Sequence, residues 1–144
     1  MIHSDTIKLL RECNSGIKMG VASIDEALPS VDDENLKRIL EESKREHVKL
    51  GKETAAMLEE YGDDSKEPGP VAKGMSWLAT NAKLALKPGD GTVADLITDG
   101  CNMGVKSLSR YLNQYEAAEE RAKDIAKRLI NLEEKLSVDI RPYL

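Results

Sequence analysis

The hexapeptide Cys13–Lys18 (CNSGIK) returns 88 residues later as Cys101–Lys106 (CNMGVK). Four of the six positions are identical, and a fifth exchanges Ile for Val. The apolar residues around the two copies follow the same spacing, which indicates an internal duplication. The sequence therefore predicts two related halves, each of them a helical hairpin.

The composition favours an all-α fold. Hydrophobic residues make up 40% of the chain but aromatic ones only 3%, with no Phe and one Trp, so Leu, Ala and Ile must fill the core. A β-sandwich would use more aromatic and β-branched residues. A length of 144 residues suits one core, and we expect a single domain over residues 1–144.

Charge and hydropathy exclude several classes of partner. The net charge of −5 argues against nucleic acid, whose ligands usually carry a basic stripe. No apolar run approaches the ~18 residues of a membrane span, so we expect no membrane partner. The N-terminus lacks the features of a signal peptide. We expect a cytoplasmic protein, and in that compartment free thiols are commoner than disulfides. Cys13 and Cys101 form no C-x-x-C motif.

Start and stop signals outline the first hairpin. Ser4 is a candidate cap for a first helix that ends near Leu28, before Pro29. Asp32 or Asp33 caps a second helix, which ends near Tyr61 because Gly62 follows. The connection between them is only a few residues long, so the two helices should pack antiparallel.

A long crossover separates the halves. Its Gly- and Pro-rich start predicts a loop, followed by a short helix over Val71–Leu86 that carries the chain back along the bundle. Thr92 is the candidate cap of the third long helix. No Gly or Pro marks the next turn, which we place at residues 113–119, before a fourth helix that packs through Ala118–Leu136. The alternative is one very long helix in a coiled coil.

The duplication predicts how the halves meet. The crossover makes the first and third helices antiparallel, related by a pseudo-two-fold axis across the bundle. Residues near that axis would face one another, so Gly16 and Gly104 would allow a close approach of the two helices. The same relation brings Cys13 near Cys101 and makes Asn14 and Asn102 equivalent.

Metal binding is the chemistry to test in such a bundle. A di-iron site uses a Glu on each of two helices and Glu-x-x-His on each of the other two. This chain has two His, and Lys44 stands where a motif ending at His47 needs its Glu. We expect no complete di-iron site. The candidate ligands for a single metal are His47, Cys13 and Cys101; the simpler interpretation is two core thiols and a hydrogen-bonded imidazole beside Ser43.

The chain resembles the ferritin-like bundles, in particular a bacterial group of unknown function related to rubrerythrin. The resemblance covers two helix hairpins, a long crossover with Trp77, and the stretch Cys101–Val105 followed by Tyr111. That group tends to carry Cys-Glu-x-Gly-Glu in this stretch. The resemblance implies a ferritin-like four-helix bundle and iron and oxygen chemistry. Here Asn102 and Val105 replace both glutamates.

Two functions are compatible with these residues. The first is a ferritin-like bundle without a complete di-iron site or cofactor, which acts as a non-catalytic binding or structural protein in a homo-oligomer. Apolar residues of the crossover helix motivate the expected self-association. The alternative is a metal-dependent oxidoreductase or metal-binding protein with an unusual site around His47, Cys13 and Cys101.

Overall fold

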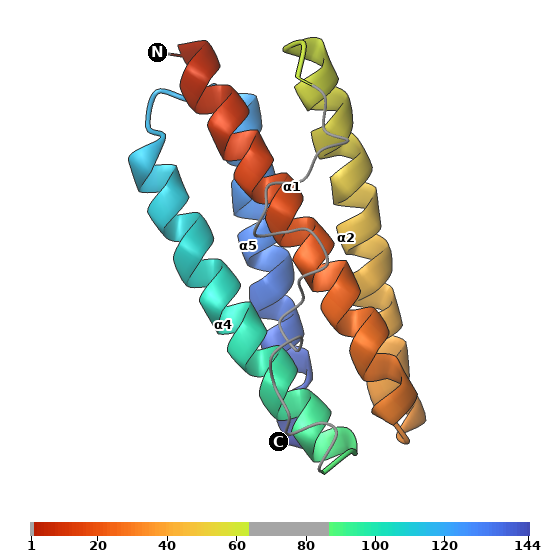
Figure 1. Ribbon diagram of the computed structural model, residues 1–144. Coiled ribbons are helices and arrows are strands. Elements are labelled where there is room, and N and C mark those ends of the chain that lie inside the picture. Colours follow the sequence, from red (N-terminus) through yellow and green to blue (C-terminus); the bar gives the residue numbers. More distant parts are fainter. Residues whose placement is uncertain (1, 64–86) are drawn as a thin grey trace.

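The computed structural model describes residues 2–63 and 87–144, so the helix predicted at Val71–Leu86, with Trp77, lies outside the described residues. Within the described ranges the chain forms long helices and no strand, which confirms an all-α four-helix bundle. The long helices are α1 (Ile2–Ala27), α2 (Glu34–Glu60), α4 (Asp90–Gln114) and α5 (Glu120–Asp139), with short 3₁₀ helices η1 (Leu28–Ser30) and η2 (Arg141–Tyr143) (Figure 1).

The long helices pack as two antiparallel pairs, α1 with α2 and α4 with α5 (Figure 1). Helix α5 also packs against both α1 and α2, and α1 packs against α4. Figure 1 shows α1 and α4 running in opposite directions, as the duplication predicts. Each half of the sequence is therefore one helix pair, and α1 and α5 contact each other across the bundle.

The ends of α2 follow the sequence signals, while the starts of α1 and α4 do not. The Asp33 carboxylate accepts the Leu36 N–H at 2.9 Å and caps α2, and Gly62 ends it at a φ of +73°. The predicted caps Ser4 and Thr92 are wrong, because α1 is already helical at Ile2 and α4 at Asp90. Gly89 takes the cap position of α4. Its φ of +136° lies in a region that glycine adopts more readily than other residues.

Both ends of the bundle are fixed by contacts between the halves. The segment at residues 115–119 separates α4 from α5, which excludes the single long helix. This segment is held on α1, where Thr6 Oγ1 accepts the Glu119 N–H at 2.9 Å. At the opposite end the Asp90 carboxylate accepts the Asp32 and Asp33 N–H groups at 2.8 and 3.2 Å. These contacts fix the relative height of the two helix pairs.

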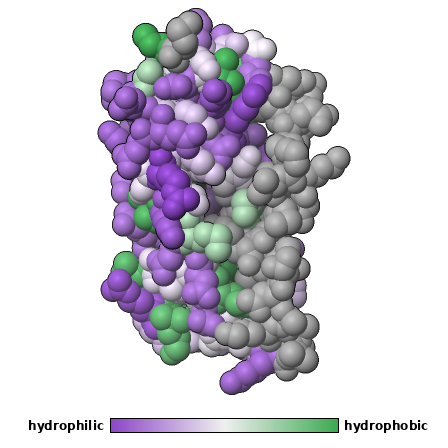
Figure 2. All heavy atoms as spheres, turned by 60° about the vertical axis from the view of Figure 1, so that its left-hand side comes forward, coloured by the Kyte–Doolittle hydropathy of each residue, from purple (hydrophilic) through white to green (hydrophobic). Residues whose placement is uncertain are grey.

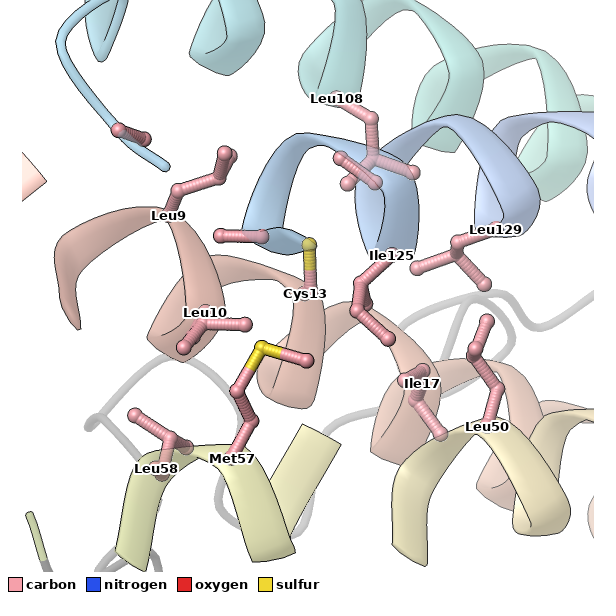
Figure 3. Close-up of a cluster of buried hydrophobic side chains, with 13 residues drawn as sticks. Leu9, Leu10, Cys13, Ile17, Leu50, Met57, Leu58, Leu108, Ile125 and Leu129 are labelled. Carbon is pink, nitrogen blue, oxygen red and sulfur yellow. The ribbon is translucent and has the colours of Figure 1, made fainter. Parts of the chain in front are cut away.

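The core is divided into two hydrophobic clusters along the bundle axis. The upper cluster, shown in Figure 3, consists of Leu9, Leu10, Cys13, Ile17, Leu50, Met57, Leu58, Leu108, Ala118, Ala122, Ile125, Ala126 and Leu129. The lower cluster consists of Ile24, Ala27, Leu36, Leu40, Val93, Leu96, Ile97, Cys101, Leu136 and Ile140. All four long helices contribute to both clusters, so the core spans both halves.

The face of the molecule on the α4 side is mainly hydrophilic. In Figure 2 hydrophobic side chains form only small, separate patches on this face. None of the helices in residues 2–63 and 87–144 is both long and apolar enough to cross a membrane.

Candidate functional site

The two predicted thiol ligands lie in different parts of the core. Cys13 belongs to the upper cluster and Cys101 to the lower one, and both are fully buried. In Figure 3 the Cys13 thiol lies among aliphatic side chains of α1, α2 and α5. The two thiols therefore do not share a cluster, although the charge of Glu133 on α5 acts on both of them. That the duplication brings them close to each other stays a prediction.

Burial keeps both thiols protonated. It raises the pKa of Cys13 from 9.0 to about 12, with smaller contributions from the negative charges of Glu12 and Glu133. Burial and the charge of Glu133 also raise the pKa of Cys101. Because the thiolate is the nucleophile and the metal ligand, neither thiol is activated in this structure.

The third predicted ligand, His47, lies between the two clusters on α2. Its ring is fully buried, and Nδ1 donates to the Ser43 carbonyl oxygen at 2.8 Å. This hydrogen bond leaves the lone pair on Nε2, which has no partner among the described residues. Burial lowers the pKa of His47 more than the Ser43 hydrogen bond raises it. The imidazole is therefore neutral at neutral pH, and the expected hydrogen-bonded histidine beside Ser43 is confirmed.

Glu133 on α5 is a buried carboxyl group that is not among the predicted site residues. Glu133 is fully buried, and neither carboxyl oxygen has a partner within the described chain. Burial raises its pKa from 4.5 to about 8, so it carries a proton at neutral pH. We call Ser43, His47 and Glu133 the polar layer, because they are the buried residues between the upper and lower clusters on α2 and α5.

The height of the polar layer follows from an ion pair above it. Arg128 on α5 pairs with Glu53 on α2 at 2.6 Å, and the two helices are antiparallel (Figure 1). At ~1.5 Å per residue, His47 lies about 9 Å and Glu133 about 7.5 Å below this pair. The two ionisable groups therefore share one level of the bundle.

The repeated glycines both face α5 and not each other. A Cβ on Gly104 would overlap the Glu133 carboxyl group and lie 3.0 Å from its Cδ. A Cβ on Gly16 would lie 3.6 Å from Cδ2 of Leu129, an ordinary contact. The prediction that Gly16 and Gly104 permit a close approach of α1 and α4 is therefore wrong. Gly104 instead leaves room for the Glu133 side chain.

The repeated asparagines also differ in environment. Asn14 is 7% exposed and lines a hollow between α1 and α2, whereas Asn102 is exposed. The related positions are therefore not used in the same way by the two halves.

The structure does not bring the three predicted metal ligands together. The two thiols are in separate clusters, and His47 lies in the polar layer between them. Across residues 2–63 and 87–144, no three His, Cys, Asp or Glu side chains gather closely enough to hold a metal ion. The polar layer instead holds one neutral imidazole and one neutral carboxylic acid.

A surface groove follows the seam between α2 and α5, outside the polar layer. It consists of two adjoining hollows of about 490 and 280 Å³, which share Glu46, Leu132 and Lys135. Ser43 lines the groove and also accepts the His47 hydrogen bond, so it connects the groove to the polar layer. The full lining of this α2–α5 groove is Ile39, Glu42, Ser43, Arg45, Glu46, Lys49, Leu50, Glu53, Arg128, Asn131, Leu132, Lys135, Leu136 and Asp139.

The groove is lined by charged and aliphatic side chains, and the polar layer lies behind it. At neutral pH the polar layer carries no charge, and both thiols are protonated. A nucleophilic mechanism needs a nucleophile activated by a base or by a lowered pKa. Comparison of the sequence with protein-family models gave no match, and neither did comparison with curated proteins.

Proposed function

We propose that this chain is a ferritin-like bundle without a complete di-iron site, and that it serves as a non-catalytic binding or structural protein in a homo-oligomer. The observation that carries the proposal is Glu133 in the polar layer, which is fully buried and whose carboxyl oxygens have no partner among the described residues. A ferritin-like metal centre uses several ionised carboxylates on facing helices. Among the described residues, Glu133 is the one carboxyl group that is fully buried, and its raised pKa keeps it neutral at neutral pH.

The ferritin-like assignment rests on the sequence resemblance and on the packing of two helix pairs. The glutamates typical of the third helix are replaced by Asn102 and Val105, and Asn102 is exposed. A cytoplasmic location, and the absence of nucleic acid as a partner, belong to the same proposal.

A second candidate is a metal-binding protein or metal-dependent oxidoreductase that uses His47. One observation favours it: His47 Nε2 is buried, holds a lone pair and has no partner among the described residues. A neutral imidazole is the form that binds transition metals. Cys13 and Cys101 would need to lose their protons and approach His47 to join it.

Elemental analysis separates the two candidates. The wild-type protein, purified without chelators, is compared with His47→Ala and with the control His3→Ala, whose side chain is exposed. We expect less than stoichiometric metal in all three proteins. Stoichiometric metal that is present in the wild type and in His3→Ala but lost in His47→Ala would overturn the first candidate. Light scattering tests the oligomer, and a monomer at every concentration would contradict it.

A further inference from the structure

The α2–α5 groove has a charge balance that differs from that of the whole chain. Its lining contains four acidic residues and four basic ones, whereas the chain has a net charge of −5. A patch with equal numbers of both charges brings no excess of like charge together when two copies meet at it. The acidic members are Glu42, Glu46, Glu53 and Asp139, and the basic members are Arg45, Lys49, Arg128 and Lys135.

The two ends of the groove carry opposite charge. Glu42 and Asp139 lie at the lower end, where α2 begins and α5 ends. Lys49 and Arg128 lie in the upper hollow with Glu53, which already pairs with Arg128. Lys49 has no ion-pair partner within the described chain.

Among the described residues, Glu42 pairs with Arg38 and Asp139 with Lys135, both at the surface. Among the residues that line only one of the two hollows, the upper end carries an excess of one positive charge and the lower end an excess of one negative charge.

We infer that the α2–α5 groove is the interface between two copies of this chain, related by a two-fold axis that crosses the middle of the groove. A two-fold axis makes the same patch contact itself with its direction reversed. It places the acidic lower end of one copy on the basic upper end of the other. The inference rests on the homo-oligomer proposed above and names the surface that forms it.

The apolar floor suits the centre of such an interface. Leu132 is half-buried and lies in both hollows, so it belongs to the middle part of the groove. Ile39 is also half-buried, whereas Leu136 and Leu50 are only 2% and 6% exposed. With the axis midway between Lys49 and Glu42, each copy brings Leu132 and Ile39 to the contact and charged side chains to its edges, as protein interfaces usually do.

The length of the groove sets the strength we expect. Residues 39–53 of α2 span roughly 21 Å at ~1.5 Å per residue. A typical specific interface buries about 800 Å² on each partner. A contact patch of this length, two helices wide, is small by that standard. We therefore expect a dimer that dissociates in the micromolar range, so association is to be measured over a wide range of concentrations.

Charge reversal tests the arrangement. Sedimentation velocity at low salt, over about 1–300 μM, gives the dimer dissociation constant of the wild type, Lys49→Glu, Glu42→Lys and the double variant. The contact between Lys49 of one copy and Glu42 of the other forms twice across a two-fold axis. Each single variant should therefore raise the dimer dissociation constant about tenfold or more. The double variant restores opposite charges and should return the constant to within about threefold of the wild type. Salt should weaken the wild-type dimer.

Lys37→Glu is the matched control, because Lys37 is an exposed lysine of α2 outside the groove. It should leave the dissociation constant unchanged. Circular dichroism checks that every variant is folded, which is expected because the exchanged side chains are exposed.

The possible failures are distinguishable. If the wild type associates but Lys49→Glu and Glu42→Lys do so equally well, the groove is not the interface, while the proposed homo-oligomer stands. If both single variants weaken association and the double variant does not recover it, the two-fold arrangement is wrong. A wild type that stays monomeric at about 300 μM overturns both the proposed oligomer and this interface.

Discussion

The two copies of the hexapeptide occupy equivalent helices and meet different neighbours. Gly16 on α1 leaves ordinary contact space beside Leu129, whereas Gly104 on α4 makes room for the Glu133 carboxyl group. Both neighbours belong to α5, which packs against α1 and α4 alike. The difference between the halves therefore originates in the helix that the repeated segments share. A sequence repeat predicts the placement of helices, but the facing side chains decide what each position tolerates.

The second helices of the halves differ in the same way. Helix α2 brings the imidazole of His47 into the polar layer, and α5 brings the carboxyl group of Glu133. Burial lowers the pKa of the first group and raises the pKa of the second. Both groups are neutral at neutral pH, and they respond to pH in opposite directions.

The largest effect that we predict is the pH dependence due to Glu133. Its pKa is 4.5 in the unfolded chain and about 8 in the folded protein. Between these values the folded protein binds more protons, so the free energy of unfolding falls as the pH rises. The stabilisation is fully present below pH 4.5, falls as the pH rises toward 8 and is gone above it. At about 1.4 kcal/mol per pKa unit, the total loss is on the order of 5 kcal/mol.

Glu133→Gln keeps the shape of the side chain and cannot ionise, so urea unfolding at several pH values isolates this effect. The variant should lose less stability than the wild type as the pH rises from 5 to 8, roughly the window between the two pKa values. Glu134→Gln is the control, because Glu134 is exposed. His47 contributes equally to all three proteins, with stability that is lost as the pH falls below 6.5. Parallel pH profiles for the wild type and Glu133→Gln would refute the buried, protonated carboxyl.

The next effect compares the repeated glycines directly. Gly104→Ala forces a methyl group against Glu133 and should lower the free energy of unfolding by about 2 kcal/mol, the usual cost of overpacking. Gly16→Ala meets no such obstacle and should raise it by up to ~1 kcal/mol through better helix propensity. Thermal or urea unfolding of the two variants measures the contrast.

A double-mutant cycle identifies the cause of the contrast between the glycines. Glu133→Ala removes the group that fills the space beside Gly104, so Gly104→Ala should cost much less in that background. If Gly104→Ala is equally costly with and without Glu133, the obstacle lies elsewhere in the bundle.

Much of the fold follows from local signals in the sequence. Pro29, Asp33 and Gly62 define the ends of the first helix pair because each has a direct conformational consequence: a lost N–H, a side-chain cap and a positive φ. The cap of α4 is Gly89, three residues before the predicted cap Thr92. Gly89 has a φ of +136° and caps the helix without a side chain, so the side-chain capping pattern does not reveal it.

The buried carboxyl group of Glu133 does have a signal in the sequence. The apolar residues of the last helix include Leu132, which is only half-buried in the structure. The buried positions alternate in steps of three and four and pass through Glu133: they are Ala122, Ala126, Leu129, Glu133, Leu136 and Ile140. An acidic residue on such a stripe was skipped because charged residues are rarely buried. No sequence pattern indicates that Gly104 accommodates it, since that contact joins two helices.

The smallest effect that we predict concerns the N-terminal caps of α2 and α5, the second helices of the two halves. Asp33 caps α2 with its carboxylate, whereas Glu119 at the start of α5 makes no cap and accepts the Tyr61 hydroxyl instead. Asp33→Ala should cost about 1 kcal/mol of unfolding free energy, and Asp32→Ala, its exposed neighbour, less than about 0.5. The hydrogen bond from the Leu36 N–H lowers the pKa of Asp33, so this stabilisation is lost as the pH falls below 3.8. Urea unfolding at pH 7 measures both variants. Equal losses would mean that α2 begins where it does because of the Asp90 contacts with the second half, and not because of its own cap.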